Sequence, residues 1–530
     1  MSSFKITFFF SFVLVATSAL LRLLAFHQTP FATGWDSYFY LVQIKSLEES
    51  GHMHSPEASL IYPYLRLFYW ITGDYVLAMK AGAAVLCGIF TLLLCCRSQS
   101  LPLLGAWSLF SPQLTYFAAQ YPKNLLGLVF FMAFVRSLDW AVSKQRAWAM
   151  LPIFLLVINY FGHRMMFGLS VLYLLLWVGL RLKLRFNRRA WCFSRRAWCF
   201  HQAHLKQDTQ RKPPFSRLHL LKTPSVAKTL LAIGVLLGVF ILLGEFFPGL
   251  THIADLGRLN GTLSWQPQFS PWSFVQSFGM ERISSWWVFE IAIVTGCWLA
   301  GLFFSRKSIS NPALFWLCGL LLFPFLEWSL TGLAWRMFLV FVLLTPLAFD
   351  FQNVPKKASI VFFTAFVAAS FFSWKSYSPG LHDPDYALFN RVTDNVKRQL
   401  SDPDSFGIKL SESSVNKPEL FIAHNALAEY FTFTTGTDAM PWLPEYTVDS
   451  SKLWRIAAGV HAQTLRYFAR PENAVKIKHL GAGYFILPEF VWQLALRNAR
   501  TEGDEYFLET AESWLNPHRI RPAFLLKRKQ

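Results

Sequence analysis

The side chains best suited to chemistry in this sequence are one carboxylate and a few cations near the ends of apolar segments. Asp36 follows the first apolar segment and opens an amphipathic stretch with apolar residues at helical spacing from Phe39 to Leu47. Such a stretch lies in the plane of a membrane interface, which would hold Asp36 between water and lipid. A carboxylate there can take a proton from an attacking hydroxyl or amide, and partial burial would raise its pKa. The alternative is a carboxylate that only caps the in-plane helix.

A second candidate is Arg336, which begins a late apolar segment shortly after Glu327. An arginine at that depth can bind phosphate oxygens through two N–H groups at once and does not lose its charge. Two alternatives remain open at this point. Arg336 can extend its side chain to the lipid headgroups, or it can form an ion pair with Glu327.

Three further basic or titratable residues stand at turns between apolar segments. His163 and Arg164 lie between two such segments and would offer a second cationic group, and Lys123 lies in the sequence Tyr121-Pro-Lys123 and could contact a phosphate. The alternatives are anchoring in the interface for His163 and Arg164, and an ordinary surface lysine at a helix start for Lys123.

Composition indicates what kind of scaffold must position these residues. The chain has 530 residues, of which 54% are hydrophobic and only 15% charged, whereas about 25% charged residues is usual for a soluble chain. Its 53 Phe and 21 Trp would leave large apolar patches on compact soluble domains. We therefore expect a polytopic membrane protein, which excludes a cytosolic enzyme, a secreted disulfide scaffold and a disordered chain.

The net charge of +19 raises the question of nucleic-acid binding. Between Arg181 and Lys228 there are 13 Lys or Arg and one acid, Asp208, so this loop carries most of the excess. Basic residues concentrated in one connection are typical of a cytoplasmic loop that sets topology. No nucleic-acid recognition module accompanies the charge, so we expect no nucleic-acid partner.

Apolar segments long enough to cross a membrane as helices define the expected spans. There are eleven: Ile6–Phe26, Tyr75–Cys96, Leu101–Ala119, Asn124–Val142, Trp148–Gly162, Met165–Leu182, Thr229–Phe247, Trp286–Phe304, Pro312–Leu326, Leu333–Phe349 and Ser359–Trp374.

The positive-inside rule gives these spans an orientation. With the N-terminus in the cytoplasm, all five inside connections carry basic residues, including the loop 181–228. The first outside loop, 27–74, then contains Asp36 and the in-plane helix. The chain divides into a transmembrane domain, 1–375, and an outside domain, 376–530.

The outside domain has a different character from the rest of the chain. It is mostly polar and alternates helix and strand signals. Tyr386–Leu400 and Lys452–Phe468 are predicted helices, and Leu420–His424 and Gly483–Leu487 are predicted buried strands. The predicted fold is a polytopic α-helical membrane protein of about eleven transmembrane helices with a C-terminal extracytoplasmic α/β domain.

This plan resembles the GT-C glycosyltransferases. The resemblance rests on a short first helix, Asp36 in a large first outside loop, an in-plane helix, and Tyr62-Pro63 leading toward the second span. GT-C enzymes use polyprenyl-phosphate-linked sugars and include oligosaccharyltransferase catalytic subunits, protein mannosyltransferases and aminoarabinose transferases. The resemblance implies that Asp36 is the base, and that a basic residue in a late helix, here Arg336, contacts the lipid phosphate.

One loop departs from the oligosaccharyltransferase pattern. Those enzymes carry further acids between the third and fourth spans, which complete a metal site, whereas Ala118–Asn124 contains no acid and has Lys123 instead. A single protein oxygen ligand is too few for a dedicated divalent metal site. We therefore expect a metal-independent transferase without a cofactor.

The resulting hypothesis is a glycosyltransferase of a bacterial inner membrane. It would pass a sugar from a polyprenyl-phosphate donor, on the outer face, to a lipid, glycan or protein acceptor. The first alternative is a transporter or flippase of a lipid-linked glycan, which predicts paired charges mid-helix and internal repeats. The clearest charged residue near a span interior, Glu290, lies only four residues inside its span. The second alternative is a non-catalytic envelope assembly protein.

Overall fold

The computed structural model describes residues 2–55, 57–95, 101–144, 150–181, 285–303, 309–322, 333–349, 364, 386–401, 420–423, 425–436, 439–441, 482–513, 515–520 and 523–527. Several predicted features lie outside these residues. They are Glu327, the basic loop after Arg181, the span Thr229–Phe247, the helix Lys452–Phe468, and the span Ser359–Trp374 apart from residue 364. The predicted domain boundary at residue 375 is also outside them and stays a prediction.

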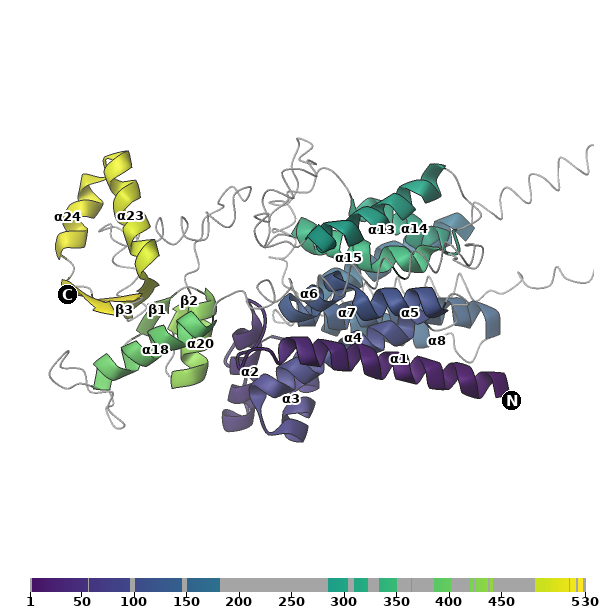
Figure 1. Cartoon of the computed structure of the whole chain (residues 1–530), viewed down its shortest axis with the longest axis horizontal. Coiled ribbons are helices and arrows are strands. Elements are labelled where there is room, and N and C mark those ends of the chain that lie inside the picture. Colours follow the sequence, from purple (N-terminus) through teal and green to yellow (C-terminus); the bar gives the residue numbers. More distant parts are fainter. Residues whose placement is uncertain are drawn as a thin grey trace, which may run out of the picture.

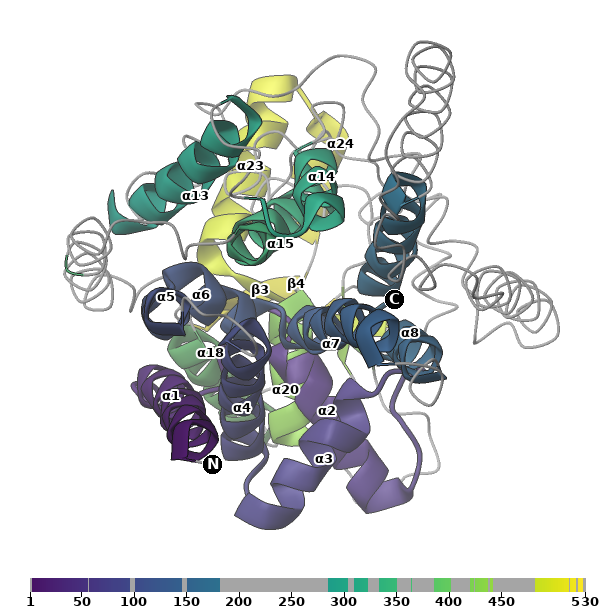
Figure 2. The ribbon, with the colours of Figure 1, turned by 90° about the vertical axis from the view of Figure 1, so that its right-hand side faces the viewer.

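A bundle of helices runs along the longest axis of the molecule (Figure 1). They are α1 (Ser2–Phe26), α4 (Tyr75–Cys95), α5 (Leu101–Phe110), α6 (Pro112–Gln120), α7 (Pro122–Lys144), α8 (Met150–Gly162), the helix Arg164–Arg181, α13 (Ser285–Phe303), α14 (Pro312–Leu321) and α15 (Leu333–Ala348). Seen along the bundle, α13, α14 and α15 form a group beside α5, α6 and α7, while α1 lies against α4 (Figure 2).

The outer faces of several helices are apolar. Large hydrophobic side chains stand exposed on α1, α8 and the helix Arg164–Arg181, among them Phe12 (63% exposed), Phe154 (59%) and Leu175 (61%). Two of the described helices, Tyr75–Cys95 and Arg164–Arg181, are long and apolar enough to cross a membrane, and several shorter apolar helices accompany them. Exposed apolar faces of this kind are favourable in lipid and unfavourable in water.

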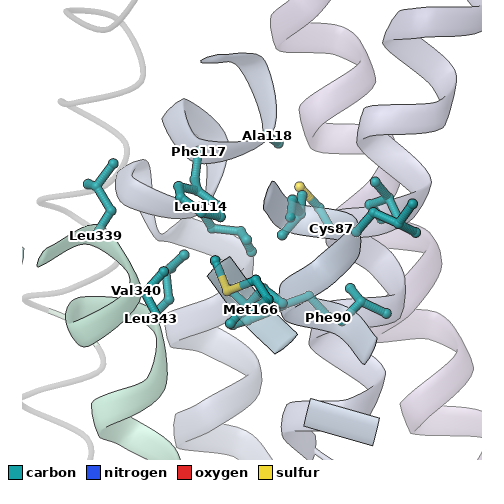
Figure 3. Packing of buried hydrophobic residues seen from close by; sticks show 14 of the residues in the cluster. Cys87, Phe90, Leu114, Phe117, Ala118, Met166, Leu339, Val340 and Leu343 are labelled. Atoms are coloured by element: carbon teal, nitrogen blue, oxygen red, sulfur yellow. The ribbon is translucent and has the colours of Figure 1, made fainter. Parts of the chain in front are cut away.

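The centre of the bundle is closely packed. The residues that meet there have almost no exposed surface (Figure 3): Cys87 and Phe90 of α4, Phe117 of α6, Met166 of the helix Arg164–Arg181 and Val340 of α15. Interiors of this density resist small displacements, so the ends of these helices are held in fixed relative positions.

The predicted third span, Leu101–Ala119, is not one helix. It breaks at Ser111, whose backbone is extended (φ −62°, ψ 112°) and whose side chain accepts a hydrogen bond from the Leu114 N–H (3.1 Å). Pro112 occupies the first turn of α6. A proline disfavours helical backbone in the residue before it and suits the start of a helix, so the sequence Ser-Pro ends α5 and begins α6.

The first loop also differs from the prediction. A helix, α2 (Ser37–Ser50), forms where the in-plane helix is predicted, and its orientation to a membrane stays a prediction. The segment after Leu60 forms a second helix, α3 (Ile61–Thr72), instead of leading directly into the second predicted span. Gly73, with φ of 69°, ends α3 and turns the chain into α4.

The C-terminal region contains both strands and helices. Strands β1 (Leu420–Ala423), β2 (Ala439–Pro441), β3 (Ala482–Pro488), β4 (Leu515–Ile520) and β5 (Ala523–Lys527) form a mixed sheet in the order β2-β1-β3-β5-β4. β1 runs parallel to β2 and β3, and β5 runs antiparallel to β3 and β4. The helices are α18 (Tyr386–Ser401), α20 (Asn425–Thr435), α23 (Glu489–Glu502) and α24 (Glu505–Ser513). Thus α18, β1 and β3 correspond to three of the predicted elements.

Two of these helices dock on the first loop. The ring of Tyr38 on α2 lies 4.6 Å from that of Tyr386 on α18 and 4.7 Å from that of Tyr430 on α20. Lys45 donates from its Nζ to the backbone carbonyl of Phe433 (3.0 Å). In Figure 1, α18, α20 and the sheet accordingly lie beyond the end of the bundle that carries α2, and the N-terminus lies at the opposite end.

Candidate functional site

The loop before α2 is fixed by contacts with α6 and α18. Gly34 has φ of +101°, and a Cβ there would lie 2.1 Å from the backbone oxygen of Ala119. Only glycine permits both this backbone conformation and so close an approach. The Trp35 N–H donates to Gln120 Oε1 (3.1 Å), and the Tyr386 hydroxyl donates to the Gly34 carbonyl (2.7 Å). These contacts place the next residue, Asp36, at the end of α6.

Asp36 stands at the N-cap position of α2 but does not act as a cap. Its side chain accepts no hydrogen bond from the backbone of the helix. Among the described residues, the Asp36 carboxylate has neither a hydrogen-bond nor an ion-pair partner. The capping alternative therefore does not account for this carboxylate.

The charges around Asp36 come from other elements. Burial raises the pKa of Asp36, the positive charges of Arg336 and Lys123 lower it, and the negative charge of Glu57 raises it again, with a net increase. Because the net pKa remains raised, Asp36 is a stronger base than an ordinary aspartate.

Arg336 reaches this group from the first turn of α15. Its guanidinium lies over the ring of Tyr121, 4.8 Å from the ring centroid. Its Nε is buried and has no hydrogen-bond partner among the described residues. The side chain thus packs against Tyr121 with its Nε buried, which argues against simple extension to the headgroups. Glu327, the predicted ion-pair partner, is outside the described residues.

Lys123 is paired with a carboxylate that the sequence analysis missed. Its Nζ forms a salt bridge with Glu57, which also accepts a hydrogen bond from the Tyr62 hydroxyl. Burial alone would raise the pKa of Glu57, but the charge and hydrogen bond of Lys123, the Tyr62 hydroxyl and the charge of Arg164 outweigh it, so the pKa is lowered. Glu57 therefore stays ionised and neutralises one of the cations of the group.

His163 and Arg164 occupy the turn after α8, close to the same charges. Burial lowers the pKa of His163 well below its usual value, and the positive charges of Lys123, Arg336 and Arg164 lower it further. His163 is therefore neutral, and the positive charge of this turn comes from Arg164. Its Nδ1 is buried without a hydrogen-bond partner among the described residues. Gly127 of α7 allows this approach, since a Cβ there would lie 2.5 Å from His163 Cβ.

Two further titratable side chains, Tyr40 and Glu429, lie near Asp36. Burial raises the pKa of the Tyr40 hydroxyl well above its usual value, and the charge of Asp36 raises it further. Burial and the charge of Asp36 likewise raise the pKa of Glu429, on α20. Tyr40 was recognisable as a neighbour of Asp36 on the in-plane helix. Glu429 is distant from Asp36 in sequence, and its proximity to Asp36 follows from the docking of α20 on α2.

The arrangement joins one accessible base to several positive charges at one end of the helix bundle. Asp36, Arg336, Lys123, His163 and Arg164 converge there from the first loop and three different interhelical regions. Among the described residues, no three of His, Cys, Asp and Glu are placed to hold a metal ion. Such a site can bind an anion and accept a proton beside it.

Comparisons with known proteins complete the description. No protein-family model matches the chain, and no curated protein matches it. Among solved structures, the chain is similar to ArnT from Cupriavidus metallidurans bound to undecaprenyl phosphate, with a TM-score of 0.49 and 12% sequence identity over 97% of each chain.

Proposed function

We propose that this protein is an integral membrane glycosyltransferase of the GT-C type. It takes a sugar from a polyprenyl-phosphate donor and passes it to a lipid, glycan or protein acceptor on the outer face of a bacterial inner membrane. The observation that carries the proposal is that Asp36 has no partner among the described residues, yet lies within the fields of Arg336 and Lys123. An enzyme of this class needs a free base beside a phosphate-binding group.

Arg336 is the principal phosphate ligand in this proposal. Its buried Nε has no hydrogen-bond partner among the described residues, and its guanidinium packs over the ring of Tyr121. A phosphate that accepts from this guanidinium would satisfy the orphaned donor, whose burial without a partner is otherwise costly. Lys123 and Arg164 add positive charge from α7 and the turn after α8, although Glu57 offsets part of it.

Asp36 supplies the base. As the acceptor's oxygen or nitrogen attacks the anomeric carbon, Asp36 takes the proton that the acceptor loses. The bond between the anomeric carbon and the phosphate oxygen breaks, and the polyprenyl phosphate leaves with one additional negative charge. Arg336 and Lys123 are placed to stabilise that developing charge. The chemistry uses these side chains alone, and we propose that it requires no metal.

The test is transfer from a panel of polyprenyl-phosphate sugars by the purified full-length chain. We expect Asp36→Asn to lower the rate of transfer by about 10²–10⁴-fold, while equilibrium binding of polyprenyl phosphate is retained. The matched control is Asp74→Asn. Asp74 is an exposed carboxylate of the same loop that caps α4 through the Leu77 N–H (2.6 Å), and an asparagine can still accept that hydrogen bond.

The outcomes separate the alternatives. Unchanged transfer in Asp36→Asn would remove Asp36 from the role of base. Movement of labelled lipid-linked sugar across a vesicle membrane without any transfer would instead indicate a transporter.

A further inference from the structure

Two buried charged side chains, Arg22 and Glu290, bind the backbone at the break between α5 and α6. Arg22 of α1 donates through Nη2 to the backbone carbonyls of Ser108 and Ser111 (3.4 Å to the latter), at the end of α5. Glu290 of α13 accepts hydrogen bonds from the Ser111 hydroxyl (2.6 Å) and the Gln113 N–H (3.1 Å), at the start of α6. Both charged side chains are almost completely buried, at 1% exposure each.

The signs of the two charges match the two helix ends. The last carbonyls of a helix have no partner within the helix and carry a partial negative charge, which a cation stabilises. The first N–H groups of a helix carry a partial positive charge, which an anion stabilises. Arg22 thus supplies a donor to the carbonyls at the end of α5. Glu290 supplies an acceptor to the N–H of Gln113 at the start of α6. Polar backbone at this depth would otherwise lack partners, which is costly in lipid.

Local sequence alone already supplies a cap for α6. Ser111 accepts from the Leu114 N–H, and Pro112 suits the first turn. A buried charge from a different helix is an expensive addition to a start that is already capped, and ionisable residues inside membrane helices commonly have functional roles. The additional effect of Arg22 and Glu290 is to fix this break to α1 and α13, which lie on either side of it.

The other end of α6 lies at the candidate site. Gln120, its last residue, accepts from the Trp35 N–H (3.1 Å), and the next residue, Tyr121, lies under the Arg336 guanidinium. α6 has 9 residues, and a helix of that length spans about 13 Å. A short helix therefore connects the buried charges to the residues that hold Asp36 and Arg336.

We propose that Arg22 and Glu290 are positioning residues for the transfer site. They fix the start of α6, and α6 in turn fixes Gln120 and Tyr121, so that the base and the phosphate ligand keep their relative geometry. The kinetic part of this inference rests on the proposed function. The structural part, the coupling between Glu290 and the Asp36 loop, is independent of it.

The experiment compares Glu290→Ala, Glu290→Gln and a control, Leu299→Ala, in the full-length protein in detergent. Leu299 lies on the same helix with its side chain 43% exposed. We expect Glu290→Ala to lower kcat by about 100-fold, since small misplacements of reacting groups cost about that much. KM for the donor should change by less than about threefold, because the backbones of Arg336, Lys123 and Arg164 all belong to elements other than α6. Glu290→Gln, which keeps one acceptor oxygen, should recover part of kcat.

Hydrogen–deuterium exchange gives a measurement that does not depend on activity. In Glu290→Ala, the peptide covering residues 31–40 should exchange faster, because the Trp35 N–H depends on Gln120, whereas peptides from α4 should exchange as in wild type. If the wild-type protein transfers no sugar, the proposed function fails and the exchange still tests the coupling.

Three results would overturn the inference. The first is that Glu290→Ala shows the same hydrogen–deuterium exchange and the same kcat as the wild-type protein. The second is an equal loss in Leu299→Ala, which would indicate a general effect on α13. If Glu290→Ala does not fold, Glu290→Gln carries the same test, and unchanged exchange in that variant is the third contradicting result.

Discussion

The hydroxyl of Tyr386, in the C-terminal region, donates a hydrogen bond to the backbone carbonyl of Gly34, two residues before Asp36 (2.7 Å). The same ring packs on Tyr38, two residues after Asp36, at 4.6 Å between centroids. One tyrosine thus contacts the chain on both sides of the candidate base. The region that follows the helix bundle in the sequence therefore helps to shape the site.

Tyr386→Phe should lower the rate of transfer several-fold and the free energy of unfolding by about 1 kcal/mol, the usual contribution of one buried hydrogen bond. The phenyl ring keeps the packing on Tyr38, so the loss reports on the hydroxyl's hydrogen bonds to the carbonyls of Gly34 and Trp35 (3.3 Å to the latter). Transfer rates and denaturant unfolding of the full-length protein measure the two effects. Tyr506→Phe, at a residue on α24 that is 44% exposed, is the control. Equal effects of both variants would contradict the role of Tyr386.

The pH dependence of transfer should report the state of Asp36. A base must be deprotonated, so kcat/KM should fall as the pH is lowered through the pKa of Asp36. Because that pKa is raised, the acidic limb should lie above the usual range of an aspartate.

Two variants should move this limb in opposite directions. Arg336→Gln removes a positive charge that lowers the pKa of Asp36, so the limb should move to higher pH, with a higher donor KM as well. Glu57→Gln removes a negative charge that raises this pKa, so the limb should move to lower pH. The pH–rate profiles of wild type and both variants provide the measurement. A limb at the same pH in all three proteins would assign it to a group other than Asp36.

The positions of Asp36, Lys123 and Arg336 at one end of the bundle could be predicted from the sequence. Span lengths and basic loops give the number of spans that precede each connection. Whether that number is odd or even decides the end of the bundle at which a residue lies. Arg164 and Arg336 lie at the same end, as the predicted even number of crossings between them requires. The cytoplasmic location of the N-terminus and the absence of a metal stay predictions.

Other features depend on tertiary contacts that a single sequence does not encode locally. Glu57 belongs to no periodic element, and its pairing with Lys123 follows from the path of the loop between α2 and α3. Glu429 reaches Asp36 only because α20 docks on α2. The break at Ser111 did have a local signal, a serine followed by a proline, but the apolar length of the segment favoured one continuous span.

The Lys123–Glu57 pair provides a test of stability that is separate from catalysis. Lys123→Ala would leave Glu57 ionised without its partner, and the two side chains are only 19% and 30% exposed. We expect a loss of about 1–3 kcal/mol in the free energy of unfolding, between the values for surface and buried pairs. The double variant Lys123→Ala/Glu57→Gln should recover most of this stability, because the unpaired charge is gone. Donor affinity should stay reduced in both.

The control for this pair is Arg66→Ala. Arg66 pairs with Glu48 in the same loop, and its side chain is 36% exposed, so the loss should be at most about 1 kcal/mol. The measurement is denaturant unfolding of the wild type, Lys123→Ala, the double variant and Arg66→Ala. If the double variant is as unstable as Lys123→Ala, the loss comes from the lysine's packing and not from its charge.

Gly34 and Gly51 form a matched pair for testing how the Asp36 loop is held. Both have positive φ, +101° and +74°, but a Cβ at Gly34 would lie 2.1 Å from the Ala119 oxygen, whereas nothing lies within 4 Å of one at Gly51. Gly51→Ala should cost about 1–2 kcal/mol through backbone strain and leave the rate of transfer unchanged. Gly34→Ala should cost more and, by pushing the loop away from α6, lower the rate by about 100-fold. Unfolding and transfer measurements on both variants separate strain from displacement. If both lower transfer equally, the close contact between Gly34 and Ala119 does not position Asp36.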